Sequence, residues 1–204
     1  MRLIKYLFAV MLLGLSSCCK CETTKAIEPL VDNPEQPDTS LGKTLIVYFS
    51  WSGHTRTVAN IIHELTGSDI VEIKVEEPYS SVYDEVTARA RHELDNDIRP
   101  ALVTRVENIA AYDTLIVGTP IWSGRLAPPV KSFLVSYDLS GKKIMPFCTH
   151  GGSGTAQSAN NIREVCPDSE ILQPLAVSGS QATSSRSAVE RWLRENKKQV
   201  TIKK

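Results

Sequence analysis

The feature that most constrains the fold is the alternation of short apolar runs with segments whose apolar residues recur at helical spacing. Residues 44–49 (TLIVYF) form an apolar run of strand length, and Val58, Ile61, Ile62 and Leu65 then recur at i, i+3, i+4 and i+7. This spacing gives a helix one apolar stripe. Because the same order repeats along the chain, it predicts strands that are connected by helices.

Five such units are predicted. The strands are expected at residues 44–49, 70–75, 114–118, 144–148 and 171–177. After the first helix, which Gly67 is expected to end, the buried helix faces are expected at Val82, Val86, Ala90 and Leu94, at Val130, Phe133 and Leu134, at Ala156, Ala159 and Ile162, and at Val189, Trp192 and Leu193. Pro128 and Pro129 suit the start of the third helix. Pro174 shortens the last strand or places it at a sheet edge.

Strands that alternate with helices form a parallel sheet that is covered on both faces. Five units predict a doubly wound α/β fold, with a five-stranded parallel sheet in the order 2-1-3-4-5. In that order the switch point lies between strands 1 and 3, and ligands bind beyond the carboxyl ends of the strands at that point. The loops after strands 1, 3 and 4 are therefore expected to carry the chemistry.

The N-terminus is predicted to be a targeting segment. Arg2 and Lys5 precede the uncharged apolar run of residues 6–15, and small residues follow it, which is the pattern of a secretory signal peptide at residues 1–17. The run is about half of the roughly 20 residues that a membrane span needs. An uncleaved anchor or a buried helix is the alternative.

The cysteine that follows this segment is a candidate for lipidation. Residues 15–18 (LSSC) resemble the lipobox of bacterial lipoproteins, in which the cysteine, here Cys18, is lipidated and becomes the first residue. Cys19 fits less well because Cys18 would precede it. A lipid on Cys18 predicts an exported protein that is anchored to a membrane, in the periplasm or on the outer cell surface.

The segment after Cys18 is predicted to be a flexible tether over residues 18–42, followed by one domain over residues 43–204. The tether is polar and contains Pro29, Pro34 and Pro37, with no periodic apolar face.

Charge and cysteine usage exclude other classes. The 204 residues include 23 Lys+Arg and 23 Asp+Glu, and a zero balance without a basic run argues against a nucleic-acid partner. The five cysteines include a cluster of three at the processing site but no second ligand pair at zinc spacing, so no metal site is expected. Cys148 is expected to be a small buried hydrophobe.

The loop after the first strand, residues 50–55 (SWSGHT), offers groups that suit a phosphate. Ser50, Ser52 and Thr55 supply hydroxyls beside Gly53, and the N-terminus of the next helix supplies N–H groups. It is not a Walker A loop, because the GxxxxGK[ST] spacing is absent. A helix cap by Ser52 or Thr55, without a ligand, is the alternative.

Two further loops suit a planar ring. In residues 119–124 (TPIWSG), Trp122 would stack on such a ring while Gly124 lets the backbone approach closely; a core Trp beside a loop Gly is the alternative. In residues 149–154 (THGGSG), the glycines would let N–H groups face a ligand, and a flexible connection is the alternative. Together, the three loops would hold a phosphorylated planar heterocycle.

These segments resemble the flavodoxin-like FMN-binding family, in particular its bacterial lipoprotein branch. The motifs of that branch are approximately SxSGxT, then Y-D-x-hydrophobic-G-x-P-x-W, then F-x-T-H-G-G-S-G. The residues that match them are Ser50, Ser52, Gly53, Thr55, Tyr112, Asp113, Gly118, Pro120, Trp122 and residues 147–154, and Pro78, Tyr79 and residues 83–91 are also similar to that branch. The resemblance covers about residues 44–195.

The resemblance implies FMN as the cofactor and assigns the three loops to its two ends. The residues implied around the phosphate are Ser50, Ser52, Gly53, His54 and Thr55. The residues implied to flank the isoalloxazine are Thr119, Pro120, Ile121, Trp122, Ser123, Gly124, Thr149, His150, Gly151, Gly152 and Ser153, with the last loop running on to Gly154.

The chain departs from the family pattern at two places. His54 stands where the family often has Asn, which would alter a phosphate contact or make it pH-sensitive. Thr119 and Ser123 stand where an aromatic residue is common, which would leave Trp122 as the main stacking group.

Three functions stay open on the sequence. The first is an FMN-dependent oxidoreductase, linked to NAD(P)H or a quinone, with electron donor and acceptor unidentified. The second is a one-electron carrier, which the zero net charge disfavours if it relies on a strongly acidic patch. The third is a surface binding module that has lost FMN. No Ser/His/Asp or Cys/His arrangement is recognisable, and His150 is either a donor to flavin or substrate or a solvated loop residue.

Overall fold

The computed structural model describes residues 40–202. The expected signal peptide, the lipidation of Cys18 and the expected tether up to residue 39 lie outside these residues. Leu41, at the end of the expected tether, is only 5 % exposed, and its carbonyl accepts a hydrogen bond from the Thr114 hydroxyl at 2.5 Å. The packed domain therefore includes Leu41.

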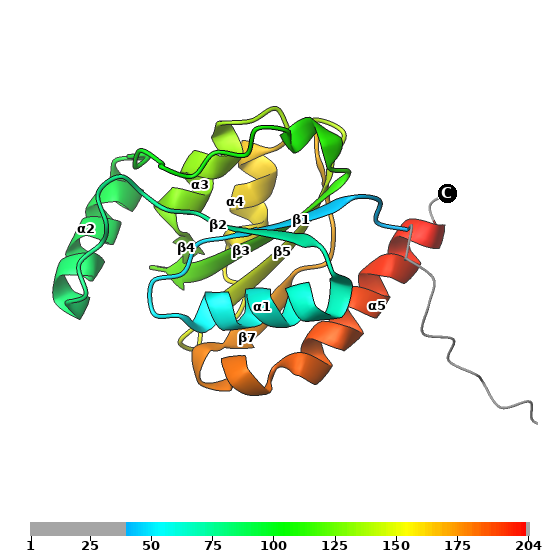
Figure 1. Cartoon of the computed structure of the whole chain (residues 1–204). Helices are drawn as coiled ribbons and strands as arrows, with labels where there is room; N and C mark the ends of the chain where they lie inside the picture. The colour runs from blue at the N-terminus through cyan, green and yellow to red at the C-terminus, as the bar shows by residue number, and fades with distance from the viewer. Residues whose placement is uncertain (1–39, 203–204) are drawn as a thin grey trace, which may run out of the picture. The chain divides into compact units, whose positions relative to one another are not determined.

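A twisted parallel sheet forms the centre of the domain (Figure 1). Its strands are β1 (Thr44–Tyr48), β2 (Asp69–Glu72), β3 (Thr114–Trp122), β5 (Lys143–His150), β6 (Glu170–Ile171) and β7 (Leu175–Ser178). The order is β2-β1-β3-β5-β6, and β7 also pairs with β5. All these pairs are parallel. The predicted order 2-1-3-4-5 and the doubly wound α/β class are confirmed, with β6 and β7 together filling the fifth position.

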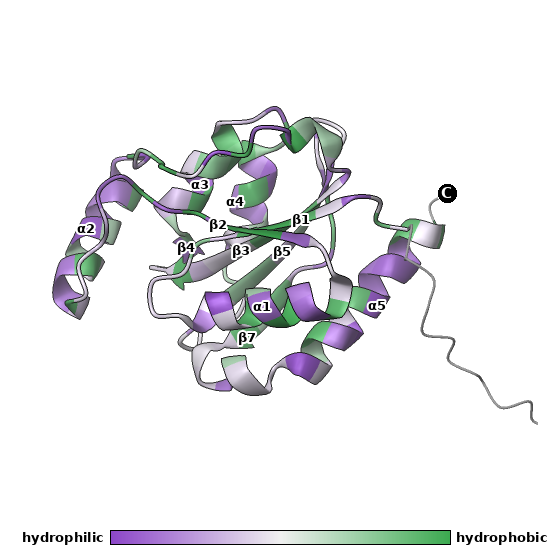
Figure 2. Ribbon diagram, viewed as in Figure 1, coloured by the Kyte–Doolittle hydropathy of each residue, from purple (hydrophilic) through white to green (hydrophobic). Residues whose placement is uncertain are grey.

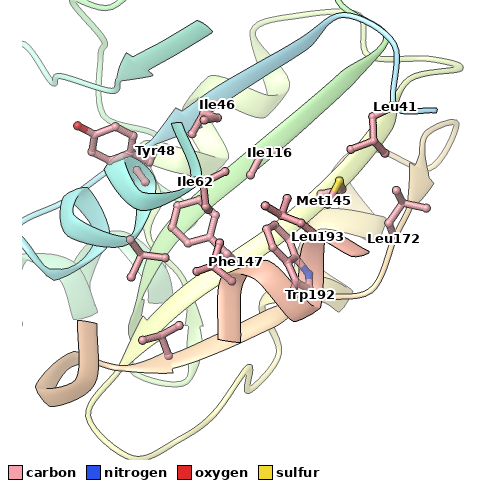
Figure 3. Packing of buried hydrophobic residues seen from close by; sticks show 14 of the residues in the cluster. Leu41, Ile46, Tyr48, Ile62, Ile116, Met145, Phe147, Leu172, Trp192 and Leu193 are labelled. Carbon is pink, nitrogen blue, oxygen red and sulfur yellow. The ribbon is translucent and has the colours of Figure 1, made fainter. Parts of the chain in front are cut away.

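Helices cover both faces of the sheet, as predicted (Figure 1). On one face lie α1 (His54–Thr66) and α5 (Arg186–Ile202), and on the other lie α3 (Pro128–Val135) and α4 (Ser158–Val165). The central strands are largely hydrophobic, whereas the helices carry mixed stripes (Figure 2). In Figure 3, Trp192 and Leu193 of α5 lie beside Met145 and Phe147 of β5. The inward face predicted for the last helix is confirmed.

The fifth strand is interrupted at Gln173 and Pro174, where Pro174 lacks the N–H that a ladder needs. Helix α5 replaces the missing partners. The Gln173 N–H donates to Asn196 Oδ1 at 2.9 Å, and the Gln173 carbonyl accepts from Trp192 Nε1 at 2.6 Å. Asn196 is fully buried. The predicted effect of Pro174 is confirmed, and a buried amide compensates for it.

Two predicted loops begin inside strands. β3 continues through Trp122 and turns back into β4 (Arg125–Leu126), which pairs with it in antiparallel fashion. Ser123 and Gly124 form the turn with φ values of 47° and 74°, the left-handed conformation that a tight hairpin requires. Likewise, Thr149 and His150 are the last residues of β5. The sequence pattern missed both extensions because Pro120 and the glycines resemble a loop.

Helix α2 (Tyr83–Asp95) departs from its predicted face. Val82 precedes the helix and is 51 % exposed, whereas Val86, Ala90 and Glu93 are buried. The helix lies off the side of the sheet, where it contacts β3 and α3 (Figure 1). Its buried stripe is therefore shorter than predicted and includes an acid.

Helix α4 begins later than predicted. Ala156, expected on its buried face, is exposed and precedes the helix with a φ of 43°. Two short 3₁₀ helices complete the domain, η1 (Ile109–Ala111) and η2 (Gly179–Ser184). Within residues 40–202, no helix combines the length and the apolar character needed to cross a membrane.

Replacing Asn196 by Ala is expected to destabilise the domain by about 1–3 kcal/mol, because it removes the acceptor of the Gln173 N–H and leaves a void in place of a fully buried amide. Urea unfolding at pH 7 measures this. Asn160→Ala is the matched control, since Asn160 is an exposed helix residue and its loss should change stability by less than about 0.5 kcal/mol. Equal midpoints for the two variants would contradict the role of Asn196.

Candidate functional site

The carboxyl ends of four strands meet at one edge of the sheet. In register, Tyr48 lies opposite Gly118, Pro120 opposite Thr149, and His150 opposite Ser178. The loops that follow these positions therefore lie side by side. The three loops predicted to carry the chemistry are brought together at the switch point between β1 and β3.

A pair of buried hydroxyls links the first of these loops to the third. Thr55 Oγ1 and Thr149 Oγ1 are 2.8 Å apart, and the two residues are 1 % and 5 % exposed. Thr55 lies in the first turn of α1 and Thr149 near the end of β5. The link therefore fixes the start of α1 against the loop that follows β5.

The turn before α1 is open to an anion. Gly53 begins the helix with a φ of 90°, a conformation that favours glycine, and makes no side-chain cap. A Cβ at Gly53 would meet nothing within 4 Å. Ser50 Oγ accepts the N–H of Arg56 at 3.2 Å, so the cap that was considered for Ser52 or Thr55 is instead made by Ser50. The start of a 13-residue helix, with hydroxyls beside it, fits the phosphate end of FMN.

His54 and Ser52 stand at the mouth of this turn. Ser52 Oγ lies 3.3 Å from His54 Nδ1, and both residues are exposed. The imidazole also lies against Gly179, where an added Cβ would be 2.6 Å from His54 Nδ1. His54 therefore bridges the first loop and the end of β7.

Of the second loop, only part is available to a ligand. Thr119 is 1 % exposed; its hydroxyl donates to the Pro120 carbonyl at 2.9 Å and accepts the N–H of Ala127 at 3.2 Å. The buried Thr119 hydroxyl therefore holds the hairpin. Pro120, Ile121 and Trp122 are half-buried, Gly124 likewise, and Ser123 is exposed at the turn.

Trp122 is packed into an aromatic cluster. The centroid of its ring lies 5.5 Å from that of Phe49 and 5.0 Å from that of Tyr79, and both pairs pack edge to face. Trp51 is oriented by a hydrogen bond from its Nε1 to the Ser80 carbonyl at 2.8 Å, and it faces Tyr83 at 6.2 Å. Part of the Trp122 ring thus belongs to the core, as its alternative proposed, and part lines an adjoining pocket.

The third loop is exposed and holds its own histidine. His150 Nδ1 accepts the N–H of Gly152 at 3.0 Å, which orients the imidazole. Gly151, Gly152 and Ser153 are exposed, and no heavy atom lies within 4 Å of a Cβ built on either glycine. This loop has room for a flat ligand beside it.

Sequence reasoning missed two sets of residues. Ser178, Gly179 and Ser180 lie at the end of β7 and the start of η2, where Ser178 pairs with His150 and Gly179 lies against His54. Their Ser-Gly-Ser pattern resembles the other loops, but only the loops after strands 1, 3 and 4 were considered. The aromatic residues Trp51, Tyr79 and Tyr83 were visible in the matching motifs, yet no site role was drawn from them.

A buried carboxylate supports the aromatic cluster from α2. Glu93 is 5 % exposed; it accepts hydrogen bonds from Tyr79 Oη at 2.5 Å and Arg89 Nε at 2.8 Å. The Arg89 guanidinium also lies 4.1 Å from the Tyr79 ring centroid. Burial, and then the bond to Glu93, raise the pKa of Tyr79, so its hydroxyl stays a donor. Two donors compensate for burying this charge.

Cys148 lies beneath the third loop but is built for packing. It is 1 % exposed, and burial raises the pKa of its thiol to about 11, with the Ser158 hydrogen bond opposing that shift. Burial also raises the pKa of Cys166 to about 11. The expectation of a buried hydrophobe at Cys148 is confirmed. Residues 40–202 hold no group of three His, Cys, Asp or Glu side chains placed to bind a metal.

At pH 8, Cys148 and Cys166 are expected to resist iodoacetamide in the folded protein and to react in 6 M guanidinium, because a pKa near 11 leaves on the order of 0.1 % thiolate. Peptide mass spectrometry locates the label. Since the folded-state pKa is the higher one, these thiols favour the folded state below about pH 8.5, and that contribution is lost as pH rises to about 11. Rapid labelling of native Cys148 would refute its burial.

Fold and crevice together define a doubly wound α/β protein with a site for a phosphorylated planar group at the carboxyl edge of its sheet. The chain belongs to the flavodoxin family, because the family model described as flavodoxin matches residues 43–196. The predicted family is thus confirmed, whereas its lipoprotein branch stays a prediction.

Solved structures support the same family. A candidate flavoprotein of Bacteroides eggerthii is 28 % identical with a TM-score of 0.68, over 76 % of this chain and 97 % of that one. A flavoprotein of Lactobacillus acidophilus in complex with FMN is 25 % identical with a TM-score of 0.58, over 74 % of this chain and 97 % of that one. The predicted cofactor, FMN, agrees with the family and with this neighbour.

Curated relatives match only a part of the chain. An NAD(P)H dehydrogenase (quinone) of Acidovorax ebreus is 34 % identical over 94 residues, which is 46 % of each protein. A protein of the same name from Caulobacter vibrioides is 32 % identical over 111 residues, 54 % of this chain and 53 % of the relative. The chain thus spans about half the length of the curated relatives it matches.

Proposed function

We propose that this domain binds FMN and acts as an oxidoreductase that passes electrons from NAD(P)H to a quinone. One observation carries the proposal. The Thr55–Thr149 hydroxyl pair, at 2.8 Å, holds an open helix start beside a glycine loop, at the edge where Trp122 also lies. One ligand with an anionic tail and a flat ring system would meet all three.

Each part of the crevice has a role in holding that ligand. The start of α1 and the hydroxyls of Ser52 and Thr55 would bind the phosphate. When Thr149 donates the hydrogen bond that the two hydroxyls share, the Thr55 O–H is left to donate to the phosphate. The end of β3 and the loop of residues 150–153 would flank the ring, with the backbone of Gly151 and Gly152 beside it.

The reaction follows from the cofactor class. Bound FMN supplies electron transfer in steps of one or two electrons, while the protein supplies binding, orientation and electrostatics. In the proposed reaction NADH, a proton and a quinone become NAD⁺ and a hydroquinone. The names of the curated relatives support this direction, and since they align over about half their length, donor and acceptor are part of the proposal.

Purified full-length protein with added FMN is expected to turn yellow and to quench flavin fluorescence, and then to oxidise NADH or NADPH when a soluble quinone is present. Absorbance at 340 nm follows the donor. A protein that holds FMN without turnover with either donor would replace the enzyme by an electron carrier. A protein that takes up no FMN would overturn the proposal and favour a binding module without flavin.

The double variant Ser52→Ala/Thr55→Ala is expected to weaken FMN by roughly 10–100-fold, because each lost hydrogen bond to a charged group costs about 1.5–3 kcal/mol, part of which solvent restores. Riboflavin, which lacks the phosphate, should lose only what breaking the Thr55–Thr149 bond costs, and should therefore weaken by a smaller factor than FMN. Quenching of flavin fluorescence gives both dissociation constants.

The matched control for this variant is Thr66→Ala/Ser68→Ala at the opposite end of α1, where Thr66 Oγ1 donates to the Ile62 carbonyl. It removes the same two kinds of hydroxyl far from the crevice. Equal weakening of FMN and riboflavin by Ser52→Ala/Thr55→Ala would contradict the phosphate role of the turn.

A further inference from the structure

A second pocket adjoins the crevice on the side of α2. It has a volume of about 310 Å³, at the lower end of the range of about 300–1,000 Å³ for ligand sites. It is lined by Trp51 of the first loop, by Tyr83, Val86, Ala90 and Arg91 of α2, and by Trp122 at the end of β3. Because Ile121 and Ser123 line it as well, it opens beside the strand end that is assigned to the flavin ring.

The walls of this pocket are held in place. The Trp51 indole is oriented by the Ser80 carbonyl, and Trp122 packs edge-on against Phe49 and Tyr79. Helix α2 is joined to β4 because Arg125 donates to the Leu94 carbonyl at 3.0 Å and to Asp95 at 2.6 Å. Its other anchor is the buried Glu93 described above. Trp51, Trp122 and the position of α2 are therefore fixed, whereas Tyr83 and Arg91 line the pocket as exposed side chains.

The lining combines aromatic surface with one positive charge. Val86 and Ala90 are each 4 % exposed and close the wall that α2 provides, while Trp51 and Trp122 present ring surface. Arg91 is exposed, and among residues 40–202 it forms no ion pair. A guanidinium without a partner beside aromatic rings suits a flat molecule that carries a negative group.

We propose that this pocket binds the electron acceptor, and that the acceptor is a planar aromatic quinone bearing an anionic substituent. Its ring lies against Trp51, Tyr83 and Trp122, and its anion meets Arg91. The redox part rests on the proposed function. The quinone gains two electrons and two protons and leaves as a hydroquinone, while NADH and one proton supply them by way of the flavin and leave as NAD⁺.

The binding part is tested by calorimetric titration of the full-length protein, with and without FMN, using two matched probes. These are anthraquinone-2-sulfonate and its neutral analogue 2-(hydroxymethyl)anthraquinone. The sulfonate is expected to bind about tenfold more tightly, since a charge-assisted hydrogen bond is worth about that factor. Arg91→Gln should abolish this preference, whereas Arg105→Gln, which replaces an exposed arginine outside the pocket, should keep it.

Tyr83→Ala tests the aromatic wall separately. Tyr83 is 68 % exposed, so its removal should spare the fold, and both probes should weaken by a similar factor of roughly three to ten. In turnover, Arg91→Gln should raise the KM of the sulfonated quinone about tenfold.

Several outcomes would overturn the proposal. These are equal affinity of the two probes, an equal effect of Arg91→Gln and Arg105→Gln, or no binding of either probe. Binding of NADH that depends on Arg91, when the sulfonate does not bind, would assign the pocket to the donor and also end the acceptor assignment. Because the titration without FMN needs no flavin, a failure of FMN binding is seen separately in the absorbance and leaves the pocket tested.

Discussion

The hydrogen bond between Thr55 and Thr149 is the contact on which the geometry of the crevice depends. Both hydroxyls are buried, so each would carry a desolvation cost if the other were missing. They join residues 94 positions apart in the chain, one at the start of a helix and one near the end of a strand. The switch point of a doubly wound sheet brings these two ends close, and this bond sets how close they stand. The bond therefore ties the turn at Gly53 to the glycine loop after His150, because each lies within a few residues of one of the two threonines.

Much of this architecture could be predicted from the sequence, and the failures have physical reasons. Apolar runs and helical spacing identify which faces are buried, so strand order and the inward face of α5 were predictable. A strand's length depends on its partners, and the extension of β3 to Trp122 exists because β5 and β4 supply hydrogen bonds that no local pattern contains. Thr119 looked like a loop ligand for this reason. The prediction for Val82 was wrong because Val82 precedes α2 and is exposed, whereas the buried stripe of the helix begins at Val86.

The position of the loops in the candidate site was predictable because the strand order determines it. The hydrogen-bond partners of individual side chains were less predictable. The three loops meet as the switch-point rule requires. The rule did not extend to the loop after β7, although Gly179 contacts His54. Nor does spacing reveal that Glu93, in the last turn of a charged helix, is buried and binds the hydroxyl of Tyr79, whose ring packs against Trp122. Burial of an acid becomes intelligible only once both of its donors are seen.

The interrupted fifth strand has a consequence for how copies of the domain meet. β6 and β7 are two and four residues long, and the strand at the opposite border, β2, has four. These short edge strands, one of them interrupted at a proline, present few successive unpaired N–H and C=O groups to the edge strand of another molecule. Asn196 and Trp192 further occupy the polar groups of Gln173. The same irregularity that weakens the ladder thus discourages strand-to-strand stacking between neighbouring molecules.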